Sequence, residues 1–188
     1  MAAPMKRGAN VGLTREIPGL TGLVVGARFT AGAEQVLLES LVFAAVLCDA
    51  DGHALSDEHF VFFNQLTTPD LSVSQLETAL GGDTEQIEID LSSVPAEVHR
   101  IVLVAYVNEA FAARRTLGQL RECTVRVLDL ADNTELVRSE NLAPALSTET
   151  ALVLGEVYRH REHWKFKVIG LGYNDGVNAV ARDVGIRL

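Results

Sequence analysis

Cysteine, aromatic residues and long apolar runs are all scarce in this chain. Its two cysteines, Cys48 and Cys123, lie inside apolar runs without a Cys-x-x-Cys neighbour, which indicates small buried side chains rather than metal ligands or nucleophiles. Aromatic residues make up only 6% of the chain, which disfavours a stacking surface for single-stranded nucleic acid. No run of about 18 apolar residues occurs, and the N-terminus lacks the apolar core of a signal peptide. We therefore expect a cytoplasmic protein without a transmembrane segment.

Basic residues are also fewer than acidic residues. The chain has 16 Lys and Arg residues against 25 Asp and Glu, a formal net charge of −9. Such a surface repels phosphate backbones and anionic lipid, and no basic run offsets it locally. We expect no nucleic-acid partner. An acidic surface instead favours cations or basic partner proteins.

Short apolar runs separated by turn residues occur along the whole length of the chain, a pattern typical of a β-sandwich. The sequence predicts roughly nine such strands. They lie near Val11–Thr14, Leu23–Phe29, Leu41–Cys48, Phe60–Phe63, Ile87–Leu91, Ile101–Val107, Thr124–Leu128, Leu152–Tyr158 and Trp164–Ile169. We therefore expect one domain over residues 1–188, mainly β, built as a two-sheet β-sandwich with one or two short helices.

Three local patterns refine this prediction. Residues 86–91 alternate between apolar and polar side chains, which predicts a strand with one wet face, whereas residues 41–47 and 101–105 are apolar on both faces and should be covered on both sides. Short helices are expected after Pro95 and over residues 177–184, where apolar residues recur at helical spacing. The polar stretch 66–82 has the length of a functional loop.

Several motifs occur in a defined order along the chain. Residues 8–14 read Gly-Ala-Asn-Val-Gly-Leu-Thr, residues 57–65 read Asp-Glu-His-Phe-Val-Phe-Phe-Asn-Gln, and residues 90–95 read Asp-Leu-Ser-Ser-Val-Pro. Residues 147–160 then read Ser-Thr-Glu-Thr-Ala-Leu-Val-Leu-Gly-Glu-Val-Tyr-Arg-His, followed by Gly-Leu-Gly-Tyr at 170–173. In this order and spacing the chain resembles the TerD family of tellurium-resistance and stress-response proteins.

The resemblance implies a two-sheet β-sandwich, a role in tellurite resistance or general stress response, and calcium binding through acidic loops. We expect no catalytic activity, and the expected partners are other proteins of a stress-response system. No Gly-x-Ser-x-Gly motif or assignable Ser-His-Asp set points to an enzyme. Two functions remain open: a stress-response protein that binds calcium weakly, and a metal-free interaction or scaffold module that has lost calcium binding.

The calcium ligands that the family typically carries are only partly present. The family's Asp-x-Asp-Leu-Asp run is replaced by residues 35–41, where Glu39 and Ser40 are the only nearby oxygen donors. Because calcium takes six to eight oxygen ligands, the remaining candidates must converge from several loops. The candidate metal ligands that the resemblance leaves are Asn64, Asp83, Glu85, Asn108 and Glu109.

One further motif suggests a metal. His160 and His163 lie three residues apart and could approach each other at a turn. Zinc sites use three or four ligands, however, and no cysteine or further histidine lies nearby in the sequence. Zinc binding is therefore the disfavoured interpretation of this pair.

Overall fold

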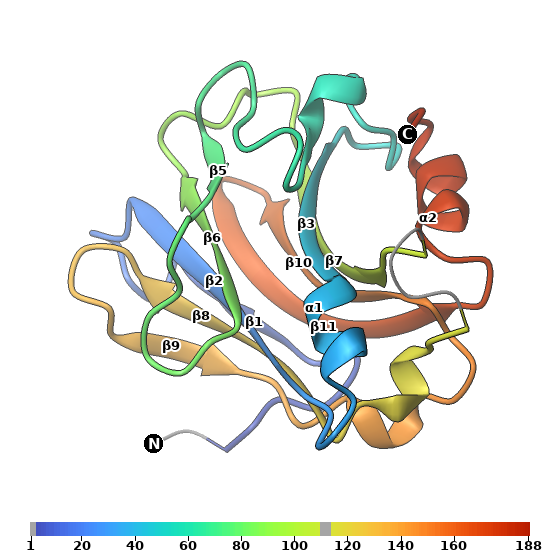
Figure 1. Cartoon of the computed structure of the whole chain (residues 1–188). Helices are drawn as coiled ribbons and strands as arrows, with labels where there is room; N and C mark the ends of the chain where they lie inside the picture. The colour runs from blue at the N-terminus through green and yellow to red at the C-terminus, as the bar shows by residue number, and fades with distance from the viewer. Residues whose placement is uncertain (1–2, 110–113) are drawn as a thin grey trace.

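The computed structural model describes residues 3–109 and 114–188, and within these ranges the chain forms two antiparallel sheets packed face to face (Figure 1). One sheet has six strands in the order β1-β11-β10-β7-β3-β4, and the other has five in the order β5-β6-β2-β8-β9. The six-stranded sheet contains β1 (Asn10–Gly12), β3 (Leu41–Cys48), β4 (Phe60–Val61), β7 (Arg100–Val107), β10 (Ala151–His160) and β11 (His163–Tyr173). The five-stranded sheet contains β2 (Gly22–Thr30), β5 (Val73–Gln75), β6 (Glu85–Asp90), β8 (Glu122–Asp129) and β9 (Glu135–Arg138). The β-sandwich predicted from the sequence is confirmed.

The main core lies between the two sheets and is built from the inward positions of alternating strands. On β6, Ile87 and Ile89 are fully buried, as the alternating pattern predicted. On the facing sheet, Phe43 of β3 and Phe166 of β11 are also fully buried. Burial of these apolar side chains supplies the main free energy that holds the sheets together.

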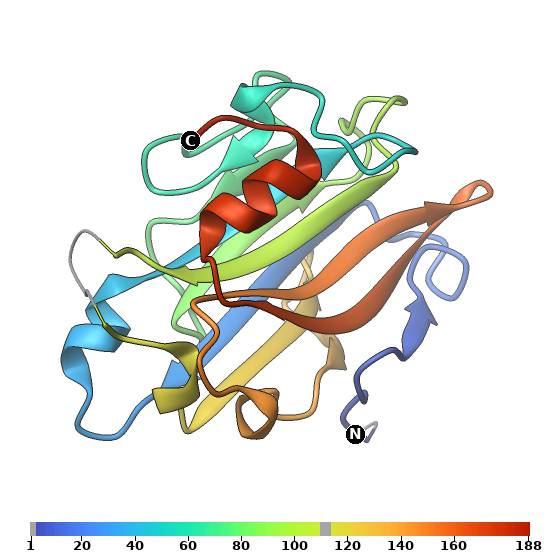
Figure 2. The same ribbon diagram turned by 90° about the vertical axis from the view of Figure 1, so that its right-hand side faces the viewer.

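A helix explains why β3 and β7 are apolar on both faces. The helix α2 (Val177–Val184) lies across the outer face of the six-stranded sheet (Figure 2). Its residues Val180, Ala181 and Val184 are buried in a second apolar cluster that includes Val42 of β3 and Val104 of β7. The helix ends at Gly185, whose φ of 75° is the left-handed conformation that glycine adopts readily at this position. The predicted helix over residues 177–184 is therefore confirmed.

Other local predictions need correction. The helix expected after Pro95 is absent, because residues 96–97 form a turn in which the Val98 amide donates to the carbonyl of Pro95 at 3.0 Å. A six-residue helix that the pattern did not predict, α1 (Gln35–Ser40), lies directly before β3. The short strands β5 and β9 were also missed.

The loop between β5 and β6 covers part of the outer face of the five-stranded sheet. Gln86 of β6 is 3% exposed there, and it exchanges hydrogen bonds with the backbone of Leu80. Arg126 of β8 donates to the Gly81 carbonyl at 3.2 Å from the same face. The face of β6 that the alternation predicted to be wet is therefore partly covered by this loop.

Candidate functional site

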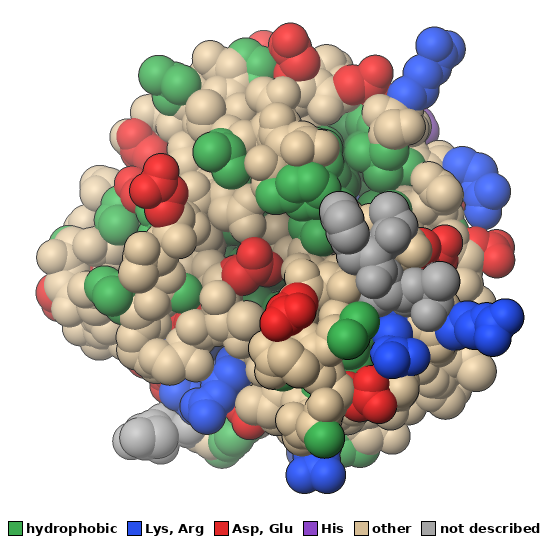
Figure 3. Space-filling model, viewed as in Figure 1, with side chains coloured by type: hydrophobic (Ala, Val, Ile, Leu, Met, Phe, Trp, Pro, Cys, Tyr) green, Lys and Arg blue, Asp and Glu red, His purple; other side chains and the backbone are tan. Residues whose placement is uncertain are grey.

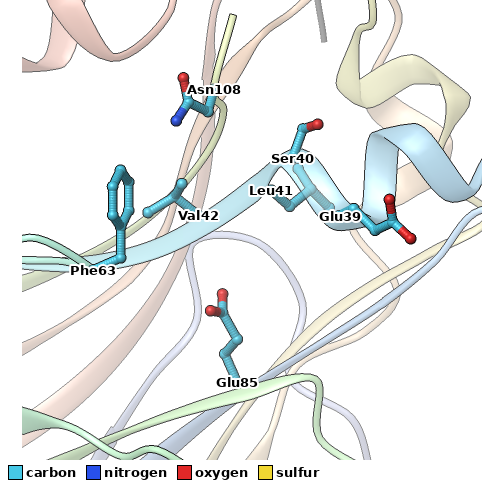
Figure 4. A pocket seen from close by; sticks show the side chains of 7 residues that line it. All are labelled: Glu39, Ser40, Leu41, Val42, Phe63, Glu85 and Asn108. Atoms are coloured by element: carbon cyan, nitrogen blue, oxygen red, sulfur yellow. The ribbon is translucent and has the colours of Figure 1, made fainter. Parts of the chain in front are cut away.

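A cavity of about 290 Å³ lies where the end of α1, the start of β3 and the start of β6 meet. Acidic and hydrophobic side chains lie beside one another around a hollow on the face shown in Figure 3. The cavity is lined by Glu39, Ser40, Leu41, Val42, Phe63, Glu85 and Asn108. Figure 4 shows Glu85 reaching from β6 toward the strand that carries Val42, with Phe63 on one side and Glu39 and Ser40 on the other.

Glu85 points into this cavity because it shares the strand parity of Ile87 and Ile89. It is the first residue of β6, so its side chain emerges at the margin of the core instead of its centre. One carboxylate oxygen accepts the amide hydrogen of Phe43 at 2.9 Å, and the other accepts from the Gln75 side chain at 3.3 Å. Strand β4 pairs with β3 only at Ala45 and Val46, so β4 does not cover the edge of β3 at Phe43. The Glu85 carboxylate accepts the Phe43 amide hydrogen there in place of a neighbouring strand.

Burial dominates the electrostatics of Glu85. Desolvation raises the pKa of this carboxyl to about 7, although the hydrogen bond from the Phe43 amide acts in the opposite direction. Tyr106 is affected in turn: its own burial, with a smaller contribution from the charge of Glu85, raises its pKa to about 12. Glu85 therefore changes its charge near neutral pH, and a cation placed in the cavity would favour the charged form.

The other polar groups of the cavity are less well directed. The carboxylate of Glu39 is turned away from Glu85 in Figure 4, and one of its oxygens accepts from the Gln35 side chain at 3.3 Å. The hydroxyl of Ser40 donates to the Val36 carbonyl at 2.7 Å, within the helix that ends there. Asn108, the residue directly after β7, also lines the cavity.

The structure separates the five predicted calcium ligands. Glu85 and Asn108 line the same cavity, whereas Asn64 is exposed in the turn after β4 and Glu109 borders a different pocket beside the start of α2. Asp83 lies on the opposite face of the five-stranded sheet from Glu85. There its side chain is 4% exposed, accepts from Arg126 Nε at 2.8 and 3.0 Å, and accepts from Gln86 at 2.7 Å.

These positions do not provide a full calcium coordination shell. Calcium takes six to eight oxygen ligands, several of them carboxylates, and in this cavity only the Glu85 carboxylate is aimed inward. Within residues 3–109 and 114–188, no group of three or more His, Cys, Asp or Glu side chains is placed to hold a metal ion. Calcium binding thus stays a prediction, and any such site in this cavity would rely on Glu39 and Ser40, which the sequence did not place in the ligand set.

Other features of the described residues bear on the function. None of the helices described here is long and apolar enough to cross a membrane. Cys48 and Cys123 are free and buried, and desolvation raises the pKa of each thiol to about 12. Both cysteines therefore fill space in the sheets, as the apolar runs around them indicated.

Comparison with known proteins identifies the family. The TerD domain matches residues 1–184 of the chain. The chain is 37% identical to general stress protein 16U of Bacillus subtilis, with 100% of both chains covered, and 34% identical to tellurium resistance protein TerD of Serratia marcescens, covering 99% of this chain and 98% of that protein.

Solved structures agree on the fold. A crystal structure of a homologue of telluride resistance protein (TerD) from Streptomyces coelicolor matches with a TM-score of 0.66 at 16% identity, covering 87% of this chain and 96% of that one. A second, of the protein SAV2460 described as of unknown function, matches with a TM-score of 0.67 at 18% identity, covering 90% and 99%. The chain belongs to the TerD domain family of tellurium-resistance and stress-response proteins.

Proposed function

We propose that this chain is a non-enzymatic stress-response protein that acts in the cytoplasm by binding another protein at the cavity around Glu85. The names of its relatives, a general stress protein and tellurium resistance proteins, support the stress-response role. The two free buried cysteines suit a reducing compartment.

The observation that carries this proposal is one half-buried carboxylate facing a cavity that is partly apolar. Leu41, Val42 and Phe63 supply the apolar surface, and Glu85 supplies a single charge that is aimed inward. A lysine or arginine side chain matches both features, since its aliphatic stem packs on apolar surface while its charged end pairs with a carboxylate. The cavity volume of about 290 Å³ lies at the low end of the range for small-molecule sites, which favours one long side chain over a larger ligand.

The surroundings favour a partner that is basic and partly apolar. The chain carries a net charge of −9, which attracts basic segments. Phe63, which lines the cavity, is 46% exposed, so a bound segment that covers its ring gains burial of apolar surface. The expected partner segment therefore presents a lysine or arginine between apolar residues.

The raised pKa of Glu85 gives this proposal a specific signature. A cation bound next to Glu85 requires its ionised form, so binding releases a proton from the fraction of molecules in which Glu85 is protonated. Affinity must then rise with pH as the carboxyl ionises and level off above pH 7. A partner bound through apolar contacts alone would show no such dependence.

Calorimetric titration with a defined peptide tests the proposal. The probe carries one lysine flanked by leucines, and its control replaces that lysine with norleucine. We expect the lysine peptide to bind about tenfold more tightly at pH 8 than at pH 6, with this difference absent in Glu85→Gln and for the norleucine peptide. Equal affinities at both pH values, or an unchanged response in Glu85→Gln, would contradict the proposal.

Glu156→Gln is the matched control for this experiment. Glu156 is a buried glutamate whose pKa is also raised by desolvation, but it lies on β10, where Arg100 approaches it at 3.8 Å. Its removal should leave peptide binding and its pH dependence unchanged. A loss of binding in Glu156→Gln as large as in Glu85→Gln would indicate a general effect of charge and not recognition at the cavity.

Weak calcium binding is the second candidate function, because four oxygen-bearing side chains, Glu39, Ser40, Glu85 and Asn108, border one cavity. With two carboxylates at most, the affinity should be low. A calcium titration of chelator-treated protein, with melting curves in parallel, separates the two functions. Heat of binding and a raised melting temperature that are both lost in Glu39→Gln and Glu85→Gln would favour calcium.

A further inference from the structure

A second cavity, of about 160 Å³, lies at the hairpin that joins β10 to β11. In Figure 2 the hairpin tip projects at the edge of the molecule, and the segment that follows β1 lies beside it. The polar side chains that line this cavity are Arg15, Glu16, His160, Arg161, His163 and Lys165. They come from two segments far apart in the sequence, and the fold brings them to one place.

Hydrogen bonds hold the two segments of this cavity together. The Trp164 amide donates to the hydroxyl oxygen of Thr14 at 2.9 Å, and the Leu13 amide donates to the Trp164 carbonyl at 2.9 Å. Trp164 is 5% exposed and packs in the main core, which fixes the hairpin next to the segment of Thr14. The cavity walls are therefore set by the fold.

The charge of this cavity is opposite to that of the chain. The chain carries −9 overall, yet Arg15, Arg161 and Lys165 meet here against one acid, Glu16. Among the described residues, none of these three cations forms an ion pair within 4.0 Å. Three unpaired cations around a concave surface raise the local concentration of anions.

The backbone at Arg161 adds an independent observation. Arg161 and Glu162 form the turn between the paired residues His160 and His163, and Arg161 has a φ of 60°. A left-handed conformation costs a non-glycine residue about 1 kcal/mol or more, and glycine is favoured at such positions of two-residue hairpins. The hairpin thus keeps a strained arginine at the cavity where glycine would be easier to accommodate.

The two histidines do not make this cavity a zinc site. Zinc requires three or four ligands, and the neighbours here are guanidinium and ammonium groups that repel a metal cation. The same groups are donors suited to oxyanions, since arginine and lysine form charge-assisted hydrogen bonds with them. The His160 and His163 pair is therefore better interpreted as part of an anion-binding surface.

We propose that this cavity binds a small, multiply charged oxyanion of the phosphate type. Its volume of about 160 Å³ is well below the roughly 300–1,000 Å³ of typical small-molecule sites, which suits an ion of a few heavy atoms better than an organic ligand. Arg15, Arg161 and Lys165 supply the positive charge. Glu16 opposes binding by its own negative charge.

Titration with inorganic phosphate, followed by nuclear magnetic resonance at constant ionic strength, tests this site. We expect saturable shifts confined to the hairpin and residues 12–16, and about tenfold weaker binding in Arg161→Gly, since one charge-assisted contact is lost. Arg114→Gly is the matched control: Arg114 also has a positive φ, of 68°, and does not line the cavity. It should bind phosphate as the wild type does.

A second variant, in which the affinity for phosphate should rise instead of fall, makes the test stricter. Glu16→Gln removes the one negative charge of the cavity, so phosphate binding should tighten several-fold. A parallel titration with O-phosphoserine distinguishes the source of the anion. If this monoester binds more tightly than inorganic phosphate, the site recognises a phosphate group on a larger molecule. If inorganic phosphate binds and the monoester does not, the site recognises the free ion.

Three outcomes would overturn the proposal. They are shifts that spread over the whole surface without saturation, equal losses of binding in Arg161→Gly and Arg114→Gly, and no gain of affinity in Glu16→Gln. Each would show that phosphate responds to diffuse positive charge and not to this cavity. The acidic cavity around Glu85 is not altered by any of these variants, so the two sites are tested separately.

Discussion

Arg126 donates from Nε to both carboxylate oxygens of Asp83, at 2.8 and 3.0 Å, on the outer face of the five-stranded sheet. Asp83 lies two residues before Glu85, yet Glu85 enters the cavity on the other side of that sheet. The acidic loop is thus divided: one carboxylate is used for stability, and the other is left to face the cavity. This division is the structural reason why Asp83 and Glu85 do not converge on one metal site.

Replacement of Asp83 should reduce stability without affecting recognition at the cavity. Its side chain is 4% exposed and that of Arg126 is 15% exposed, so Asp83→Asn leaves a largely buried guanidinium short of its main partner. We expect a loss of about 2 kcal/mol in the free energy of unfolding, measured by urea denaturation. Glu122→Gln, which breaks the exposed pair with Arg28, should cost less than 1 kcal/mol. Equal effects of the two variants would contradict this assignment.

Gly26 should be intolerant of a side chain because Asp83 lies directly over it. A Cβ atom at Gly26 would overlap the carboxylate of Asp83 and push it away from Arg126. Gly26→Ala should therefore cost about 1–3 kcal/mol. In an Asp83→Ala background the same substitution should cost much less, and a double-mutant cycle measures the difference. Additive costs would show that the two residues do not share this contact.

The stability of the protein should depend on pH through Glu85. Its folded pKa of about 7 lies above the ordinary value of 4.5, so the folded state binds this proton more tightly than the unfolded state. The stabilisation that comes from protonated Glu85 is fully present below about pH 4.5 and is lost as pH rises through 7. Glu85→Gln should therefore be more stable than the wild type by about 3 kcal/mol at pH 8 and equal to it near pH 4.

Denaturation curves of both proteins across this pH range check the Glu85 prediction. Exposed Glu97, replaced by Gln, serves as the control and should follow the wild-type curve throughout. A constant difference between Glu85→Gln and the wild type at every pH would mean that the carboxyl titrates alike in the folded and unfolded states.

The outer apolar cluster should need α2 for its stability. Val180 is 2% exposed and packs against β3 and β7, so Val180→Ala should lower the free energy of unfolding by about 1–2 kcal/mol. Asn178→Ala, on the exposed side of the same helix, should change it by less than 0.5 kcal/mol. Chemical denaturation of the two variants measures this, and similar costs would indicate that the helix does not dock through Val180.

The fold could be predicted where the pattern of side chains repeats over a whole strand. Residues 41–47 are apolar on both faces, and the structure confirms that this strand is covered by the facing sheet on one side and by α2 on the other. The strands β5 and β9 were missed because their sequences, Val-Ser-Gln and Glu-Leu-Val-Arg, form neither a clear apolar run nor an apolar–polar alternation. The helix expected after Pro95 failed because a proline suits a turn as well as a first helical turn.

The candidate site could be predicted only in part, because its geometry depends on contacts between distant residues. The ion pair of Asp83 with Arg126 spans 43 residues, which no local pattern encodes. The inward direction of Glu85, by contrast, was available from the sequence: it has the same parity as Ile87 and Ile89 in the alternating strand. The family pattern predicted ligands in charged loops. The alternation of side chains along the strand, by contrast, identifies Glu85 as the carboxylate that faces the cavity.

The pKa of Glu85 in the free and peptide-bound protein is the measurement that tests the central claim most directly. It can be followed by nuclear magnetic resonance of the side-chain carboxyl carbon, assigned by comparison with Glu85→Gln. The account predicts a pKa of about 7 in the free protein, and a value lower by at least about one unit when the lysine peptide is bound but not when the norleucine peptide is added. An ordinary glutamate pKa in the free protein, or a pKa that the lysine peptide leaves unchanged, would contradict the proposal that this cavity recognises a cationic side chain.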